Sequence, residues 1–438
     1  MFGFISPFLI VGISVLILRS FMRDMKPWER RLLAFGFVFQ LFGIIAIIGV
    51  TKYYYGGGDM LNYHEHGNRI ANLWSTNLTA FGPMVWELLI QTGGAELAPY
   101  GSGTATGSMH AMGAILGLAT GGSLFSSCAI VGFGGFFSRL IIYRLMRSEL
   151  ESRYWRPIMI ATMLMPSVVY WSSGLLKESV ALAVLGPLMW GARKLTRKHN
   201  RLAGLFPLAL GLVVCGLFKA YLLPPFVLAA AAWFYVARSR RNGVVTTTIK
   251  PGRLILAGAA AIALLLVIGT IMPRYDFRTI QSQVAKEQHQ GSYVSGGSDF
   301  RLQGSAPSST AGFLLTAPWA VVTALFRPAV IEARNPLSLL NSLETLVLLI
   351  MLFQAVSRNG ILKCVQRIRS SGLLTFCSVF TLVLAMGVGF STTNMGTLSR
   401  YRMPLVPFFV VVLVVLRDRE SKTLASRTSS LGSPASGL

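Results

Sequence analysis

Residues 32–50 read LLAFGFVFQLFGIIAIIGV, an unbroken apolar stretch with one amide side chain and no charge. At about 1.5 Å per helical residue, such a stretch forms a helix of roughly 28 Å, close to the hydrocarbon thickness of a bilayer. The whole chain has the same character: 53% of its 438 residues are hydrophobic, 13% are charged, and the mean hydropathy is +0.59. Soluble domains carry about 25% charged residues. The sequence therefore predicts a polytopic membrane protein and excludes a soluble enzyme.

Further apolar runs separated by polar breaks predict an all-α protein of about eleven transmembrane helices. The predicted spans are residues 4–18, 32–50, 112–138, 157–172, 175–192, 203–218, 221–236, 254–272, 337–356, 373–390 and 405–416. Two shorter apolar stretches, 79–92 and 313–326, are expected to form interfacial or re-entrant helices within long external loops.

These loops cover about residues 51–111 and 273–336 of a single polytopic membrane domain, residues 1–416. Residues 417–438 follow it and are rich in Ser, Gly and other small residues. Such a composition predicts a disordered cytoplasmic tail.

The charge distribution predicts the orientation of the chain. Six segments on one side of the predicted membrane hold 28 of the 40 Lys and Arg residues and 6 of the 16 acidic residues, a net charge of +22. These segments are 19–31, 139–156, 193–201, 237–253, 357–370 and 417–438. The rest of the chain, with 12 basic and 10 acidic residues, has a net charge of +2. The positive-inside rule then places the basic side in the cytoplasm, the N-terminus outside and the C-terminus inside. Membrane topology thus explains the overall +24, and no nucleic-acid partner is expected.

Polar residues gather on the predicted outer side, and the first group follows the second span. Gly56-Gly57-Gly58 allows a tight turn and delivers Asp59 to the start of a helix. Asp59 is interpreted either as a helix cap or as a general base facing a membrane-embedded substrate. The nearby His64-Glu65-His66 run is a poor metal site because two imidazoles spaced by two residues point apart on a helix.

A second group lies on an external hairpin between two short spans. Trp171 and two serines precede Lys177 and Glu178 at the lip of the next span. Charged residues at this depth are costly and often line a cavity. Neighbouring residues cannot face one another on a helix, so Lys177 and Glu178 each need another partner. Snorkelling would explain Lys177 but not Glu178.

The third and fourth groups carry arginines. Arg327 precedes the re-entry of the chain into the membrane, where it is expected either to pair with Glu332 or to bind substrate. Arg400 and Arg402 precede the last span on its external side, against the positive-inside rule. The guanidinium fork suits phosphate oxygens at headgroup depth, so we expect phosphate binding or headgroup anchoring here. One of the two arginines is expected to pair with an acid such as Asp59 or Glu178.

Two of these groups resemble a known family. Gly58-Asp59, followed by Tyr63, and the stretch Arg400-Tyr401-Arg402-Met403-Pro404 resemble the polyprenyl-phosphate-dependent membrane glycosyltransferases of the GT-C superfamily, in particular their protein-mannosyltransferase-like members. The chain lacks the adjacent Asp-Glu pair of that family, because Met60 follows Asp59, so another acid has to complete the dyad. The Trp-Ser-Ser-Gly-Leu-Leu-Lys-Glu hairpin that ends at Glu178 is similar, more weakly, to bacterial polysaccharide polymerases.

Both resemblances imply glycan assembly on a lipid carrier at the outer face of a bacterial-type cytoplasmic membrane. The implied donor is a polyprenyl-(di)phosphate-linked sugar, and the implied acceptor is a glycan, a lipid or a protein. Asp59 or Glu178 would be the catalytic base. The substrate- or phosphate-binding residues would be Lys177, Arg327, Arg400, Arg402, Tyr63 and Trp171. No cofactor is assigned, and a divalent metal is left open.

A transporter or flippase for lipid-linked glycans is the competing class. Acids within spans, such as Glu344 and Glu178, could serve proton coupling. Transporters place their sites near the bilayer midplane, whereas the ionisable residues of this chain concentrate at one face. The sequence therefore favours the enzyme.

Overall fold

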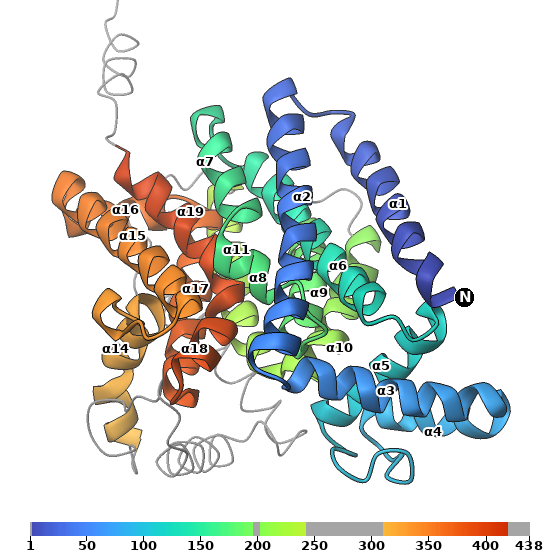
Figure 1. The fold of residues 1–438 in the computed structure, drawn as a ribbon. Coiled ribbons are helices and arrows are strands. Elements are labelled where there is room, and N and C mark those ends of the chain that lie inside the picture. The colour runs from blue at the N-terminus through green and yellow to red at the C-terminus, as the bar shows by residue number, and fades with distance from the viewer. Residues whose placement is uncertain (1, 196–201, 242–309, 419–438) are drawn as a thin grey trace, which may run out of the picture.

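The computed structural model describes residues 2–195, 202–241 and 310–418. The predicted span 254–272, most of the second external loop and tail residues 419–438 lie outside the described residues. The described chain folds into helices joined by turns and short loops (Figure 1).

Residues 2–195 contain nine α-helices and one π-helical turn. They are α1 (Phe2–Met22), α2 (Pro27–Gly49), η1 (Val50–Tyr54), α3 (Asp59–Thr76), α4 (Leu78–Ile90), α5 (Ala105–Thr120), α6 (Leu124–Arg147), α7 (Ser152–Met163), α8 (Pro166–Trp171) and α9 (Lys177–Leu195). The remaining described elements are η2 (Leu202–Gly204), α10 (Leu205–Lys219), η3 (Ala220–Leu222), α11 (Leu223–Arg241), α14 (Thr310–Phe326), η5 (Val330–Glu332), α15 (Pro336–Asn359), α16 (Ile361–Arg369), α17 (Gly372–Ser391), α18 (Met395–Arg402), η6 (Met403–Leu405) and α19 (Val406–Arg417).

Seven helical runs within the described residues are long and apolar enough to cross a membrane. These runs are Phe2–Met22, Pro27–Tyr54, Leu124–Arg147, Leu202–Arg238, Pro336–Asn359, Gly372–Ser391 and Met395–Arg417. The chain is therefore a polytopic helical membrane protein, but the structure does not support the predicted count of eleven spans.

Glycine and proline explain two of the differences. The predicted span 112–138 is wrong because α5 ends at Gly121 and Gly122, whose φ angles of 64° and 77° turn the chain before α6 begins. The predicted span 157–172 is broken between α7 and α8, where Pro166 disfavours a helical conformation at the preceding residue.

The run Leu202–Arg238 contains a turn at η3. Gly204, at its start, lies against Lys194, and Trp233, near its end, lies under the guanidinium of Arg193. Both ends of the run thus meet the end of α9, and η3 lies at the opposite end of the bundle. α10 and α11 form a helical hairpin whose tip carries Lys219.

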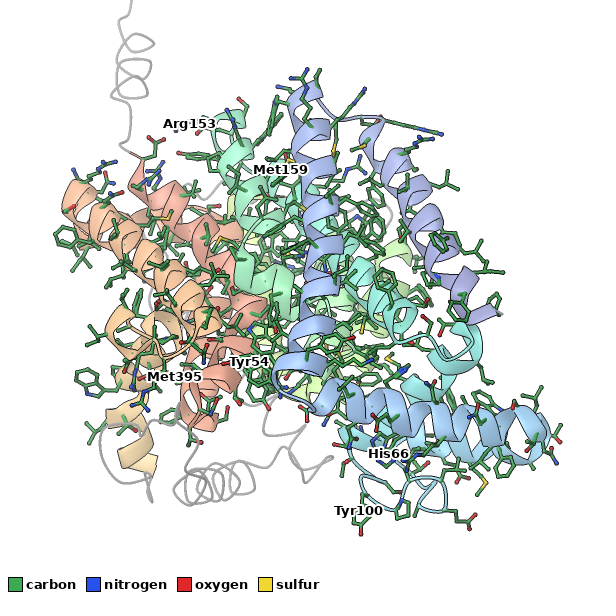
Figure 2. The ribbon with its side chains drawn as sticks, viewed as in Figure 1. Tyr54, His66, Tyr100, Arg153, Met159 and Met395 are labelled. Atoms are coloured by element: carbon green, nitrogen blue, oxygen red, sulfur yellow. The ribbon has the colours of Figure 1, made fainter. Side chains whose placement is uncertain are left out.

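The bundle has two chemically different ends. One end, called here the basic end, contains Arg147, Arg153 and Arg367, which contact Glu29, Asp418 and Tyr154. At the other end α3 and α4 lie crosswise to α2, as Figure 1 shows. This end is called here the cluster end, because the charged side chains of Asp59, Glu178 and Arg400 meet there. Figure 2 shows Arg153 at the basic end and Tyr54, His66, Tyr100 and Met395 toward the cluster end.

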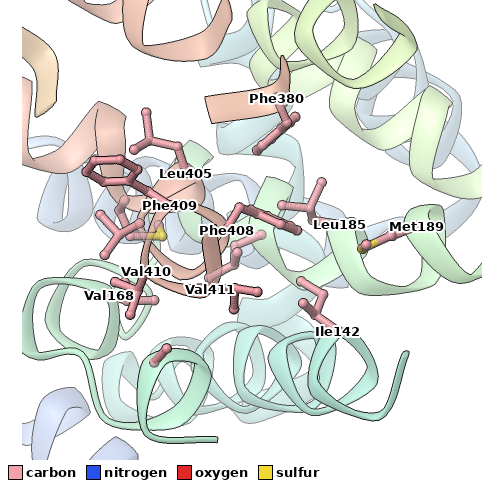
Figure 3. Close-up of a cluster of buried hydrophobic side chains, with 14 of the residues drawn as sticks. Ile142, Val168, Leu185, Met189, Phe380, Leu405, Phe408, Phe409, Val410 and Val411 are labelled. Atoms are coloured by element: carbon pink, nitrogen blue, oxygen red, sulfur yellow. The ribbon is translucent and has the colours of Figure 1, made fainter. Parts of the chain in front are cut away.

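A buried apolar core lies between the two ends. Figure 3 shows Phe408 of α19 and Phe380 of α17 packed near Leu185 of α9 and Ile142 of α6. The rings of Phe380 and Phe408 lie 4.9 Å apart at 65°, an edge-to-face arrangement. Lipid tails are as apolar as these side chains, so close packing and buried polar contacts, more than exclusion from water, hold such helices together. This core fixes α19, and with it the position of α18 at the cluster end.

Candidate functional site

The chain changes direction sharply at Gly56-Gly57-Gly58, between the end of η1 and the start of α3, which lies crosswise to α2. Gly56 and Gly58 have φ angles of 69° and 137°, a region that favours glycine. Asp59 is the first residue of α3, and Gly58 occupies the cap position without a side-chain cap. Asp59 is therefore not the helix cap, which was one interpretation of the sequence. Its carboxylate points to another helix.

Arg400 of α18 joins two carboxylates that come from two other helices. Its Nη1 donates to Oδ2 of Asp59 at 2.8 Å, and its Nε lies 3.3 Å from Oε1 of Glu178. The pairing of one arginine with Asp59 or Glu178, expected from the sequence, is found with both acids at once. A planar guanidinium can hold two partners in fixed directions, so Arg400 links the start of α3 to the start of α9.

Lys219, at the tip of the α10–α11 hairpin, joins Asp59, Glu178 and Arg400 in one charged cluster. The sequence analysis missed this lysine. Its Nζ lies 2.8 Å from Oε1 of Glu178 and 4.1 Å from the centroid of the Tyr401 ring. The ring of Tyr221 flanks the same ammonium at 5.2 Å. The signal was present: Lys219 falls between the apolar runs 203–218 and 221–236, on the side where basic residues are scarce.

Glu178 and Asp59 differ in their surroundings. The side chain of Glu178 is 2% exposed and lies between two cations, Lys219 and Arg400. The side chain of Asp59 is 49% exposed, with Arg400 on one side. Glu178 is thus a buried anchor for two cations, and Asp59 is the carboxylate that a molecule outside the bundle can reach.

Lys177 precedes Glu178 but points to a different partner, as its position on the helix predicts. Its Nζ donates to Oγ1 of Thr106 at 2.8 Å and lies 5.6 Å from the ring centroid of Tyr63. Burial, with the charges of Asp59 and Glu178, raises the pKa of Tyr63, so its hydroxyl stays protonated at neutral pH. Lys177 and Tyr63 extend the cluster along α3 and α5.

The cluster has an excess of positive charge. Asp59 and Glu178 contribute two negative charges, and Arg400, Lys219 and Lys177 contribute three positive charges. Lys177 has a neutral hydroxyl as its hydrogen-bond partner, so its charge is not matched by a carboxylate contact. A net charge of +1 at partly buried positions favours an anionic ligand.

α3 and α5 cross in close contact at a pair of glycines. A Cβ placed on Gly67 would lie 2.5 Å from the carbonyl carbon of Gly113, and a Cβ on Gly113 would lie 2.5 Å from the carbonyl oxygen of Tyr63. Next to this crossing, His110 contacts Asn62 at 3.1 Å through Nε2. Burial, then the neighbouring charges of His66 and Lys177, lowers the pKa of His110 to about 4. His110 is therefore neutral and belongs to the packing of α3 on α5.

Arg402 lies on the opposite face of α18 from Arg400 and does not join the cluster. Its side chain is buried, and Nη1 donates to the carbonyl oxygens of Ala324 and Arg327 at the C-terminal end of α14. Glu344, buried in α15 as expected, accepts from the backbone nitrogen and hydroxyl of Ser167. These contacts give Arg402 and Glu344 structural partners away from Asp59.

The two remaining predicted site residues also have local partners. Nε of Arg327 donates to both carboxylate oxygens of Glu332 at 2.9 and 3.2 Å, which is the structural pair considered from the sequence. Burial alone would raise the pKa of Glu332, but hydrogen bonds from Arg327 and from the backbone of Ala329 hold it below its usual value. The ring of Trp171 packs edge-on against Tyr170, with centroids 5.0 Å apart.

The carboxylates of the cluster do not fit a divalent metal. Among residues 2–195, 202–241 and 310–418, no group of three or more His, Cys, Asp or Glu side chains is arranged to hold one. Asp59 and Glu178 lie beside cations of the chain, Arg400 next to both and Lys219 next to Glu178.

The comparisons with known proteins give no relative for this arrangement. No family model matches the chain, and no curated protein or solved structure matches it significantly. The charges of the cluster are the feature of the chain that bears on its function.

Proposed function

We propose that the chain is a membrane glycosyltransferase that uses a polyprenyl-(di)phosphate-linked sugar as donor at the cluster end. The observation that carries this proposal is the bridge from Arg400 to Asp59 and Glu178. It unites an accessible carboxylate with three cations at one end of a bundle of apolar helices. A lipid-linked phosphate needs cations at headgroup depth, and an acceptor hydroxyl needs a nearby base.

In this proposal the cations hold the donor phosphate. The polyprenyl tail lies along the apolar helices, and the phosphate lies near Lys177, Lys219 and Arg400. As the bond between the anomeric carbon and the phosphate oxygen breaks, negative charge builds on that oxygen, and the cations stabilise it. The net charge of +1 in the cluster supports this assignment.

Asp59 is the proposed base and Glu178 the proposed positioning residue. Asp59 takes the proton of an acceptor hydroxyl, whose oxygen forms the new bond to the anomeric carbon. The phosphate leaves with the electron pair of the old bond, and the configuration inverts in this single displacement. Glu178 is too buried to meet an acceptor; it keeps Arg400 and Lys219 in place. Tyr63 is buried beside Lys177, and its ring helps to keep that ammonium in position.

The charge distribution supports an outward-facing site. The basic end would lie in the cytoplasm under the positive-inside rule, which puts the cluster at the outer face of a bacterial-type cytoplasmic membrane. Near the start of α1, the hydroxyl of Ser6 donates to the carbonyl of Thr120 at the end of α5, the helix that packs on α3. The proposed process is cell-envelope or exopolysaccharide assembly, with a glycan, lipid or protein as acceptor.

A transporter or flippase is the second candidate, and Glu344 is the observation in its favour. This acid is buried inside a candidate span, where proton-coupling residues are found. Both of its carboxylate oxygens accept hydrogen bonds from Ser167 at the start of α8. The accessible acid and the three clustered cations lie at the helix ends, which favours the enzyme over a midplane transport site. A repeat-unit polymerase of the same pathway would use the same cluster with a longer donor.

The test is Asp59→Asn, which keeps the size of the side chain and removes the charge. A strain that depends on this variant should contain normal amounts of the protein, lose most of its glycan product, and accumulate the lipid-linked precursor. Glu65→Gln, an exposed acid on the same helix, is the matched control and should leave the product unchanged. Normal product from Asp59→Asn would refute the assignment of Asp59 as base.

A further inference from the structure

The short helix α16 connects two spans at the basic end of the bundle. It contains nine residues, too few to cross a bilayer, and lies between the end of α15 and the start of α17. Because its neighbours on both sides are candidate spans, α16 lies where the membrane surface meets the protein.

The inner side of α16 is fixed to the bundle. Cys364 is buried with its Sγ 3.6 Å from the carbonyl oxygen of Ala355. Arg367 donates from Nη1 to the carbonyl oxygen of Asp418 at 2.7 Å and from Nη2 to the hydroxyl of Tyr154 at 2.8 Å. These contacts determine which side of α16 faces outward.

The outward side of α16 is apolar. Ile361, Leu362 and Val365 are 66%, 80% and 42% exposed. At 100° per residue they occupy one arc of the helix, and Lys363 lies on the opposite arc. An exposed apolar arc with cations beside it and at its end, here Lys363 and Arg369, is typical of a segment that lies in the membrane interface.

The exposed charges carried by α16 and by the end of α15 are all positive. Arg358, Lys363 and Arg369 are exposed, and the sequence contains no acidic residue between positions 345 and 417. Three cations beside an exposed apolar arc are complementary to a phospholipid surface with anionic headgroups. A zwitterionic lipid would satisfy the apolar arc equally well but would give these cations no net attraction.

We propose that α16 is an interfacial binding site for anionic phospholipid. Ile361, Leu362 and Val365 insert among the acyl chains of the leaflet at the basic end, and Arg358, Lys363 and Arg369 bind the phosphate groups. This site is independent of the proposed glycosyl transfer, because it uses other residues at the opposite end of the bundle.

The insertion of α16 can be measured on the full chain with a fluorescent probe on a single added cysteine. The four natural cysteines are buried, which leaves an added surface cysteine as the reactive one. Val365→Cys and Lys363→Cys place the probe on opposite sides of α16. In vesicles, a quencher attached to lipid acyl chains should quench the probe at position 365, and aqueous iodide should quench the probe at position 363. Equal quenching at both positions, or shielding of position 365 from both quenchers by another protein, would overturn the proposal.

Headgroup preference is measured as the phosphatidylglycerol retained by the full-length protein from nanodiscs that also contain phosphatidylcholine. Each cation at such a surface contributes about fivefold in binding. The double variant Lys363→Gln/Arg369→Gln should therefore retain roughly 25-fold less phosphatidylglycerol. The matched control is Lys52→Gln/Arg69→Gln, which removes two exposed cations at the cluster end and should leave retention unchanged. No preference for phosphatidylglycerol in the unmodified protein, or an equal loss in the control, would refute the site.

Discussion

Arg400 and Asp59 lie 341 positions apart in the chain, yet their side chains meet at 2.8 Å. This contact joins the last spanning region to the start of α3. Glu178 lies 3.3 Å from Nε of the same guanidinium, so the two acids lie near different nitrogens of one planar group. Lysine has a single side-chain nitrogen and is a poor replacement for arginine in such an arrangement.

Arg400→Lys and Arg402→Lys should have different effects. A lysine at position 400 has one nitrogen in place of the two that face Asp59 and Glu178, and the loss of a charge-assisted contact of about 1.5–3 kcal/mol should lower glycan product about ten- to a hundredfold at normal protein level. A lysine at position 402 is one bond shorter than the arginine that reaches the two carbonyl oxygens at the end of α14, so it should lower the melting temperature in detergent. Product and melting temperature, measured on the same samples, separate the two roles. If Arg400→Lys keeps full product, the arginine serves only as an anchor in the lipid headgroups.

Glu178 and Lys219 should behave as a coupled pair. Lys219→Met leaves a buried carboxylate with one cation fewer, and breaking a buried pair typically costs about 3–5 kcal/mol. The double variant Glu178→Gln/Lys219→Met removes both charges and should recover much of the lost stability. The double variant should make little glycan product, because Arg400 loses its second carboxylate. Thermal unfolding of the two single variants and the double variant gives the coupling energy, and strictly additive effects would contradict the pairing.

Gly113→Ala should disturb the crossing of α3 and α5. Its new methyl group would lie 2.5 Å from the carbonyl oxygen of Tyr63, a contact that requires the helices to move apart. Overpacking of this kind costs about 1–3 kcal/mol. Gly12→Ala is the control, because a Cβ on Gly12 meets no atom within 4 Å. The expected result is a lower melting temperature and reduced product for Gly113→Ala alone.

Reporter fusions test the orientation of the two ends. A reporter that is active only in the cytoplasm should work after Arg147 or Arg367, at the basic end, and should fail after Tyr100, at the cluster end. The physical reason is the retention of Lys and Arg on the cytoplasmic side during insertion. Activity after Tyr100 would place the cluster in the cytoplasm and remove the basis for an outward-facing transferase.

The helical membrane class was predictable from the residue pattern, because long apolar runs have few other structures available. Span boundaries were less predictable. The run 112–138 is apolar throughout, and hydropathy does not reveal that Gly121 and Gly122 turn the chain within it. By contrast, the break predicted between 203–218 and 221–236 is present, because α10 ends at Lys219 and α11 begins at Leu223.

The sequence predicted three residues of the cluster, but it did not determine which of them contact one another. Asp59, Glu178 and Arg400 were expected at one face because each follows or precedes a span. Their contact with each other depends on how α3, α9 and α18 pack, which a single sequence does not encode in any local pattern. Arg402 was grouped with Arg400 by its position in the chain, but residues two apart on a helix point in nearly opposite directions. Closeness in the chain therefore suggested, wrongly, that Arg402 lies beside Arg400 in the cluster.

α3 is packed closely on α5 at Gly67, so a small tilt of α3 at this crossing would move its N-terminal end, which carries Asp59. Eight residues separate this crossing from Asp59, a distance of about 12 Å along the helix. A tilt of about 5° at the crossing would therefore move the carboxylate by about 1 Å, enough to lower a reaction rate about a hundredfold. The crossing residues Gly67 and Gly113 have no ionisable side chain. Small residues far from Asp59 would therefore determine the position of the proposed base.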